Sequence, residues 1–206
     1  MKLRFPDNTI REYNEGITSL EIANSISESL AREVLAVKYN GKICDLTEPL
    51  REDGDIYFLR WSDNEGKSVF WHSSAHLMAS AISYYYPGVK FAIGPDIENG
   101  FYYDVDMGDN VLSSDDFSKI EKKILELSKE KNSFKKEYVT KERALNYFRQ
   151  NEYKIELIKE LEEGEISIYK CGDFVDLCRG PHLPHTGFIK AVKLLNIAGA
   201  YWRGNE

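Results

Sequence analysis

Two short motifs that contain histidine constrain the fold of this chain more than any other feature. His72 and His76 lie in the run His-Ser-Ser-Ala-His, and Cys178 and His182 lie in the run Cys-Arg-Gly-Pro-His. The residues of each pair are four positions apart, and three of the four histidines of the chain lie in these motifs. We therefore expect a fold that brings the two distant pairs together in one site.

The spacing within each motif indicates how its side chains converge. We expect a helix over residues 68–86, and residues four apart on a helix share a face, with Cβ atoms about 5–6 Å apart. Glycine and proline between Cys178 and His182 predict a turn that folds both side chains toward a common centre. These ligand types suit a zinc site, and the imidazoles equally suit a hydrolytic pocket that holds and deprotonates water.

A structural role is the alternative for each of these residues taken singly. A lone histidine on a helix face is more often structural than functional, whereas four such residues in two matched pairs favour a site. His185 has no matching partner and is expected to lie at the surface. Cys44 and Cys171 are expected to be ordinary small residues in or near the core.

The composition is typical of a soluble globular protein of a reducing cytosol. The chain has 206 residues, enough for one large or two small domains, with 42% hydrophobic and 30% charged residues. It shows no apolar run long enough for a transmembrane helix and no signal-peptide pattern near its start. The three cysteines are an odd number, which argues against a disulfide framework.

The net charge bears on nucleic-acid partners. At −7, it argues against a protein that wraps a long nucleic acid, because phosphate contacts need clustered lysine and arginine. Recognition of a single RNA terminus in a local pocket remains compatible with this charge.

Residues 1–61 are expected to form a small α+β domain of the β-grasp type, with the element order ββαββ. Thr18 followed by Glu21 gives the capping-box pattern at the start of its helix. The pair Asn40-Gly41 is the strongest short signal for a β-hairpin. Strands are expected at residues 3–5, from residue 10, at 36–39 and at 56–59.

The polar run 62–67 is the best candidate for a domain linker. Residues 68–198 are expected to form a larger α+β domain with an antiparallel sheet and a long helix that begins near Ser114. A hairpin is expected over residues 90–105, with its turn at 98–100. The remaining elements are expected as strands at 134–139, 166–169 and 174–177 and as helices at 140–148 and 153–161.

Four runs in the larger domain carry a specific resemblance to a known family. They are His72-Ser-Ser-Ala-His-Leu-Met-Ala79, Ala92-Ile-Gly-Pro95, Asn99-Gly-Phe-Tyr-Tyr-Asp104 and Asp176-Leu-Cys-Arg-Gly-Pro-His182. In this order they resemble the editing domain of bacterial and eukaryotic-type threonyl-tRNA synthetases. Residues 1–61 are similar to the TGS domain that precedes it, and 198–204 resemble the passage into the synthetase core. Residues 199–206 are thus expected to begin the connection to a catalytic core that lies outside this N-terminal fragment.

The resemblance implies hydrolysis of seryl-tRNA(Thr), a product of misacylation. Serine lacks one methyl group of threonine, and a lost methyl contact gives about 1–3 kcal/mol of discrimination. A second site too tight for the threonine methyl removes the error. Cleavage of the ester at the 3′-terminal adenosine needs an activated water, support for an oxyanion and a proton for the leaving ribose oxygen.

Roles for the two motifs follow from the resemblance. His72 is expected to activate water or to position it against the ribose, and His76 and His182 are expected to hold the pocket and its water. Cys178 is expected to line the pocket without acting as a covalent nucleophile, because the ester is already activated and water is the acceptor.

Four further residues match family positions or adjoin the hairpin turn. Lys154 is expected to support the oxyanion or the terminal phosphate; its alternative is a solvated surface lysine. Asp176 is expected to bind the substrate ammonium or to orient a histidine; its alternative is a turn or surface carboxylate. Tyr103 and Asp104 are expected to line the pocket.

The resemblance also implies the cofactors and partners. No metal is expected for editing, with zinc held by His72, His76, Cys178 and His182 as the alternative. The full-length parent would use ATP, magnesium and a zinc in its core. Its expected partners are the 3′ acceptor end of tRNA(Thr) carrying serine and the remaining domains of the synthetase, in a cytoplasmic homodimer without a membrane.

Three alternative functions remain open from the sequence. TGS domains also occur in GTPases and alarmone enzymes, so a non-catalytic tRNA-binding or regulatory module is one; a P-loop motif is missing from the chain. An alanyl-type zinc-dependent deacylase is another, although those relatives tend to read Cys-Gly-Gly-Thr-His and lack a TGS domain. A generic zinc hydrolase would explain neither the TGS-like part nor the run 99–104.

Overall fold

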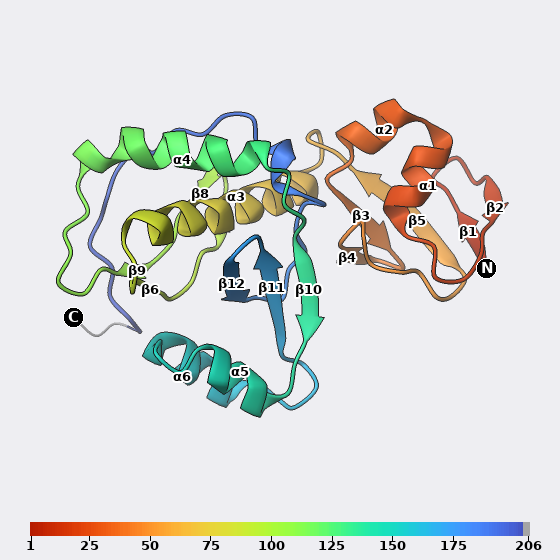
Figure 1. Ribbon diagram of the computed structural model, residues 1–206. Helices are drawn as coiled ribbons and strands as arrows, with labels where there is room; N and C mark the ends of the chain where they lie inside the picture. Colours follow the sequence, from red (N-terminus) through yellow and green to blue (C-terminus); the bar gives the residue numbers. More distant parts are fainter. Residues whose placement is uncertain (204–206) are drawn as a thin grey trace. The chain divides into compact units, whose positions relative to one another are not determined.

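The structure is a computed structural model that describes residues 1–203 (Figure 1). Residues 204–206, including Gly204 of the closing run named above, lie outside the described residues. Internal contacts divide the chain into two compact units. The first unit comprises residues 1–73 together with 180–184, and the second comprises residues 74–179 and those from 185 onward.

The first unit contains a five-stranded sheet with the order β2-β1-β5-β3-β4. Strand β1 runs parallel to β5, and the other neighbours are antiparallel. Two helices cover one face of the sheet (Figure 1), where Ile22 and Ala23 pack with Leu3, Val37 and Ile56 in a buried core. The bounds are β1 Lys2–Arg4, β2 Ile10–Glu12, α1 Ser19–Ile26, α2 Glu28–Glu33, β3 Ala36–Tyr39, β4 Lys42–Cys44 and β5 Gly54–Leu59.

Two local predictions from the sequence of this unit are confirmed, one for a helix cap and one for a hairpin turn. Thr18 is the N-cap of α1, and its side chain forms the reciprocal capping box with Glu21. Asn40 and Gly41 connect β3 to β4 with φ angles of 48° and 79°. Positive φ at both central residues is what a type I′ hairpin turn requires.

The expected single helix of the first unit was wrong, and so was the order ββαββ. Ser27 adopts an extended conformation, with φ −166° and ψ 148°, and ends α1. Its hydroxyl accepts a hydrogen bond from the backbone N–H of Leu30, so the same residue caps α2. The observed order is ββααβββ. The second helix arises because a serine that competes for backbone hydrogen bonds interrupts an otherwise helical pattern, and the additional strand is β4, which pairs with β3.

Helix α3 spans Asn64–Tyr85 and passes through the division between Ser73 and Ser74. It begins four residues earlier than the sequence predicted, inside the polar run 62–67. Gly66 lies close to the backbone of Arg60, since a Cβ there would be 2.2 Å from the Arg60 carbonyl oxygen. The first turn of α3 is thus formed by polar residues of the expected linker, and its glycine permits this close approach. The helix ends before Pro87-Gly88, as expected.

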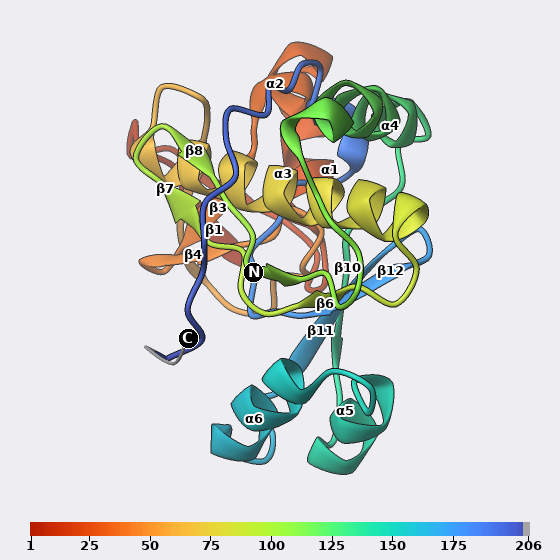
Figure 2. The same cartoon turned by 90° about the vertical axis from the view of Figure 1, so that its left-hand side faces the viewer.

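The second unit combines helices with a three-stranded antiparallel sheet of order β10-β11-β12. Helices α5 and α6 lie at one end of this sheet, and α4 and the C-terminal half of α3 lie at the other (Figures 1 and 2). The bounds are η1 Ser114–Asp116, α4 Phe117–Lys129, β10 Lys135–Tyr138, α5 Lys141–Tyr147, α6 Glu152–Glu160, β11 Ser167–Cys171, β12 Phe174–Leu177 and η2 Thr186–Phe188. These elements confirm the expected long helix, antiparallel sheet and α+β class.

The expected hairpin over residues 90–105 is split into two short ribbons. Strand β6 (Lys90–Phe91) pairs with β9 (Val105–Asp106), and β7 (Asp96–Ile97) pairs with β8 (Gly100–Phe101). Pro95 has no N–H to donate to a ladder. The ring of Tyr103 also lies against Gly94, where a Cβ would be 2.4 Å from it. Within residues 1–203, no helix is long and apolar enough to cross a membrane.

Candidate functional site

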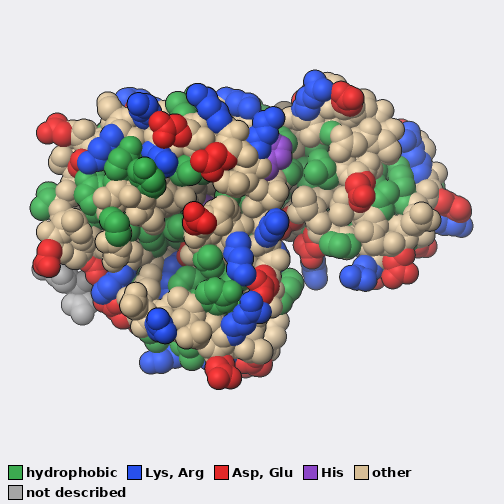
Figure 3. Space-filling view, in the orientation of Figure 1, with side chains coloured by type: hydrophobic (Ala, Val, Ile, Leu, Met, Phe, Trp, Pro, Cys, Tyr) green, Lys and Arg blue, Asp and Glu red, His purple; other side chains and the backbone are tan. Residues whose placement is uncertain are grey.

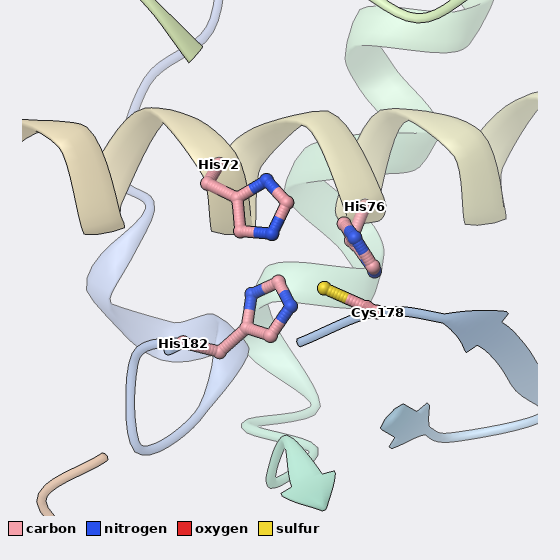
Figure 4. Close-up of side chains that lie close together, drawn as sticks. All are labelled: His72, His76, Cys178 and His182. Carbon is pink, nitrogen blue, oxygen red and sulfur yellow. The ribbon is translucent and has the colours of Figure 1, made fainter. Parts of the chain in front are cut away.

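The structure brings the two predicted motifs together. His72 and His76 occupy successive turns of α3, and Figure 4 shows both rings on the side of the helix that faces Cys178 and His182. One ligand atom from each of the four residues lies within 4.8 Å of the others. His76 and His182 are buried, whereas His72 and Cys178 are half-buried. The group is thus only partly accessible to solvent.

His182 is held at its backbone and at its ring. Its N–H donates a hydrogen bond of 2.6 Å to Oδ1 of Asp45, which follows β4. Its Nδ1 lies 3.0 Å from the hydroxyl of Ser73, which also accepts a bond from the N–H of Leu183. All of these groups are buried and belong to the first unit.

The contacts of Ser73 assign the tautomer of His182. The Ser73 hydroxyl lies 2.8 Å from the carbonyl oxygen of Val69, and two oxygens at this distance need a proton between them. Ser73 therefore donates its single proton to Val69, and Nδ1 of His182 carries a hydrogen that it donates to Ser73. Nε2 of a neutral His182 then has a lone pair that can accept a proton from water or bind a metal.

The ring of His72 stacks on the ring of His182. Their centroids are 4.5 Å apart and the planes differ by 14°. Parallel stacking fixes the orientation of the half-buried His72 ring against one that is already anchored. Each imidazole of this pair is thus positioned by protein contacts.

His76 is part of a second buried network, which is centred on Asp176 of β12. Nε2 of His76 lies 3.5 Å from Oδ2 of Asp176, and the Tyr103 hydroxyl donates a hydrogen bond to the same oxygen. Nζ of Lys154, on α6, lies 2.6 Å from Oδ1. The carboxylate therefore has a partner on each oxygen and a cation on one side.

The network shifts two ionisation equilibria in opposite directions. Burial alone would raise the pKa of Asp176, but the charges of Lys154 and His76, with hydrogen bonds from Lys154 and Tyr103, bring that pKa below its ordinary value. Burial raises the pKa of Tyr103 well above its ordinary value, and the neighbouring Asp176 charge raises it further. Asp176 is thus an anion and Tyr103 a neutral donor at neutral pH.

The placements of Lys154 and Asp176 exclude their surface alternatives. Lys154 is 2% exposed and Asp176 is 2% exposed, so neither is a solvated surface residue. Tyr103 is 9% exposed and contacts the network, as described. Asp104 is half-buried and makes its described hydrogen bonds through its backbone, to Ala92 and Ile93. Burial raises the pKa of its carboxyl group.

The expectation for His185 was wrong in part. The residue is half-buried, its ring packs on Phe188, and its Nδ1 accepts a hydrogen bond from the N–H of Gly187. Burial lowers the pKa of its ring. Cys171 is buried in the second unit, and burial raises its pKa to about 12, which makes it an unreactive thiol.

Two positioning residues, Asp45 and Ser73, were missed by the sequence reasoning. Ser73 follows His72 directly, and its place inside a functional motif was an available signal. Asp45 lies 137 residues from His182, and a carboxylate that binds so distant a backbone N–H leaves no pattern in the sequence. One contact of this kind is visible only in three dimensions.

The donor set matches zinc in the type and number of its ligands. Three imidazoles and one thiol can supply four ligand atoms. Tetrahedral zinc bonds of about 2.0–2.3 Å place the ligand atoms about 3.5 Å apart. The described separations of up to 4.8 Å therefore have to contract by side-chain rotation if zinc binds.

A cavity in the second unit reaches the Asp176 network. Its volume is about 750 Å³, and its lining includes Lys154, Phe174 and Asp176. Ser80 and Tyr84 of α3 line it as well. The buried ion pair thus has open volume beside it that a small polar group can occupy.

Comparisons with known proteins identify both ends of the chain. Residues 1–58 match the TGS domain, and residues 166–206 match the "Threonyl and Alanyl tRNA synthetase second additional domain". The whole chain is 57% identical to threonine–tRNA ligase of Cytophaga hutchinsonii, of which it covers 32%. The corresponding identities are 56% for Parabacteroides distasonis and 54% for Bacteroides thetaiotaomicron, with 32% of each relative covered.

Over its whole length the chain matches the N-terminal region of threonine–tRNA ligases, and its two ends match the two family models named above. It spans about a third of the length of these relatives. In this chain, the residues that match the TGS domain lie in the first unit. The residues that match the second additional domain include Asp176, Cys178 and His182. The expected family is confirmed, with TGS and editing domains in the predicted order.

Proposed function

We propose that this region of a threonine–tRNA ligase hydrolyses the ester of seryl-tRNA(Thr). The observation that carries the proposal is the group of His72, His76, Cys178 and His182, whose ligand atoms lie within 4.8 Å. Imidazoles in this number serve to hold water and to move protons. The match to the second additional domain supports an aminoacyl-tRNA ester as the substrate.

In this proposal His72 activates or positions the attacking water. Its ring is half-buried and stacked on His182, so it reaches solvent while its plane is fixed. His182 presents the Nε2 lone pair, because its Nδ1 is engaged by Ser73. Water that bridges two such rings is oriented for attack on the ester carbonyl.

Asp176 orients His76 rather than binding the substrate ammonium. Its two oxygens already contact Lys154, Tyr103 and His76, which leaves little capacity for a second cation. A carboxylate on Nε2 of His76 holds that nitrogen protonated and turns Nδ1 toward the site. Lys154 then supports the oxyanion through the field of the network, and Tyr103 and Asp104 flank the pocket.

Cys178 lines the pocket and forms no acyl-enzyme. Its carbonyl oxygen accepts a bond from Ser167, and its N–H donates to the Ser167 carbonyl, which fixes the residue at the end of β12. A water nucleophile makes a thioester unnecessary, because the aminoacyl ester is already activated. Retention of part of the activity in Cys178→Ala agrees with this role, and a trapped thioester would refute it.

Selection against threonine requires a pocket that its extra methyl group cannot enter. Steric exclusion discriminates more strongly than the about 1–3 kcal/mol of one lost methyl contact. The whole ligase would join threonine to its tRNA with ATP, magnesium and a core zinc. Its remaining domains, tRNA(Thr) and a second subunit are the proposed partners.

Deacylation assays test the proposal. Seryl-tRNA(Thr) and threonyl-tRNA(Thr) are incubated with the chain and with a His72→Ala/His76→Ala variant. Loss of serine but not threonine, abolished in the variant, is expected. Binding of tRNA without hydrolysis of either ester would contradict the proposal and favour a non-catalytic module.

A chelator arm of the same assay decides about zinc. We propose a metal-free route, in which the anchored imidazoles alone hold the water. Zinc held by three of these four residues would leave its fourth position to a water and would lower the pKa of that water. Unchanged hydrolysis after dialysis against a chelator, with no zinc detected by elemental analysis, is expected. Loss of activity that added zinc restores would show the alternative.

A further inference from the structure

The loop that carries His182 is physically part of the TGS-containing unit. Residues 180–184 cluster with residues 1–73 and not with the strand that precedes them. His182 is 1% exposed and Leu183 is 1% exposed. A segment from the second additional domain is therefore buried within the N-terminal unit, and the contacts that hold it decide where the His182 ring lies.

Asp45 makes the shortest described contact to this loop. Its Oδ1 accepts the N–H of His182 at 2.6 Å, and the aspartate is 5% exposed. Hydrogen bonds to an ionised acceptor are shorter and stronger than neutral ones, contributing about 1.5–3 kcal/mol. Loss of the acceptor would leave the His182 N–H buried without it, in a place from which water is largely excluded.

Asp45 and Ser73 together leave His182 little freedom. Asp45 fixes the backbone amide, while Ser73 binds the next amide, of Leu183, and the ring Nδ1. A side chain has two torsions between an anchored backbone and an anchored ring nitrogen, so fixing both ends selects one rotamer. The ring position at the site depends on an aspartate of the TGS domain, which ends at residue 58 by its family match.

We propose that Asp45 is a positioning residue for His182, so that the TGS domain supplies a structural element of the hydrolytic site. The inference rests on the proposed hydrolysis for its functional consequence. A TGS domain that served only to contact tRNA would need no buried carboxylate on a backbone amide of the editing loop. The role acts through His182, and Asp45 itself does not touch the substrate.

The test compares variants of Asp45 with a matched control. Asp53→Asn is the control, because Oδ1 of Asp53 accepts the N–H of Lys2 at 2.7 Å in the same unit without contacting the loop. Asp45→Ala should lower kcat for seryl-tRNA(Thr) by about 10- to 100-fold, the range known for residues that orient metal-binding imidazoles. KM should change little, since tRNA contacts remain. Asp45→Asn retains an acceptor oxygen and should show a smaller loss.

A second readout does not require activity. Hydrogen exchange of the His182 amide, followed by NMR, should be slow in the unaltered protein and in Asp53→Asn. It should be faster in Asp45→Asn and faster still in Asp45→Ala. If the alanine variant fails to fold, the asparagine variant alone still decides both measurements.

The outcomes separate the two proposals. Absence of hydrolysis in the unaltered chain, with amide exchange that responds to Asp45, defeats the proposed function and retains the positioning role. If folded Asp45→Ala hydrolyses seryl-tRNA(Thr) with the same kcat as the unaltered protein, the positioning role is defeated. An equal loss of kcat in Asp45→Ala and Asp53→Asn would also overturn it, because the effect would then be general to the unit.

Discussion

Lys154 and Asp176 leave 3% of each side chain exposed in an ion pair of 2.6 Å. Removing two charges from water costs several kcal/mol, and their attraction in the interior largely offsets this cost. The pair therefore adds little net stability, whereas either partner left alone would be an uncompensated buried charge. Its value lies in holding an anion beside His76.

Replacement of Lys154 by methionine should destabilise the fold by about 3–5 kcal/mol, because Asp176 loses its buried counter-charge. Urea denaturation measures the change. Lys170→Met is the matched control, since Lys170 pairs with Glu137 at 2.7 Å with 35% and 30% of the side chains exposed. A half-exposed pair contributes less than about 1 kcal/mol. Equal losses in the two variants would contradict the argument.

The lowered pKa of Asp176 predicts a pH dependence of a definite sign. The unfolded carboxyl has a pKa near 3.9, so the ionised native form adds stability above roughly pH 4. This contribution is lost as the pH falls through the lower folded pKa. The free energy of unfolding should therefore differ most between the unaltered protein and Asp176→Asn at neutral pH. A difference that stays constant down to about pH 3 would argue against it.

At the scale of single elements, the caps and turns followed from the sequence. Thr18 with Glu21 and Asn40 with Gly41 act through neighbours in the chain, so their patterns are complete locally. The break at Ser27 and the split ribbon at Pro95 were missed. Each depends on one residue that overrides a regular apolar pattern, by a competing hydrogen bond or a missing donor.

The cap of α1 can be tested by itself. Thr18→Ala should lower the free energy of unfolding by about 1 kcal/mol, because the N–H of Glu21 loses its acceptor. Thr47→Ala is the control at an exposed position of the same unit. Thermal denaturation followed by circular dichroism measures both. Indistinguishable midpoints for the two variants would show that the capping box contributes nothing.

At the scale of the whole molecule, charge limits how RNA is bound. On the face in Figure 3, lysine and arginine side chains alternate with acidic ones, without one continuous basic stripe. With a net charge of −7, we expect the protein to neutralise few phosphates of a bound RNA. The proposed hydrolysis needs the terminal nucleotide and its ester rather than a long duplex.

Binding of the acceptor end should accordingly depend weakly on salt. For about two neutralised phosphates on a single strand, affinity should fall by less than about tenfold between about 50 and 200 mM salt. Fluorescence anisotropy with a labelled single-stranded RNA of the 3′ acceptor end measures this slope. A fall of about a thousandfold, as for proteins with six or more phosphate contacts, would require a basic surface that the charge distribution does not suggest.

Most of the candidate site was predictable, and the remainder was not, for a physical reason. Helical spacing marked His72 and His76, because residues four apart share a face of a helix, and the glycine and proline between Cys178 and His182 marked a turn. The burial of Lys154 and Asp176 is decided by how β12 and α6 pack, which periodicity does not encode. Asp45 acts on a main-chain amide, and main-chain amides are the same in every residue.

The first unit is discontinuous in sequence, and this has a consequence for its biogenesis. Asp45 and His182 are separated by 137 residues, so the chain leaving the ribosome presents residues 1–73 long before 180–184 are made. The nascent N-terminal unit lacks its last buried segment during that interval, and closing so long a loop is slow. Assembly of the histidine cluster thus becomes a late folding event, which defers any hydrolytic competence until translation has passed residue 184.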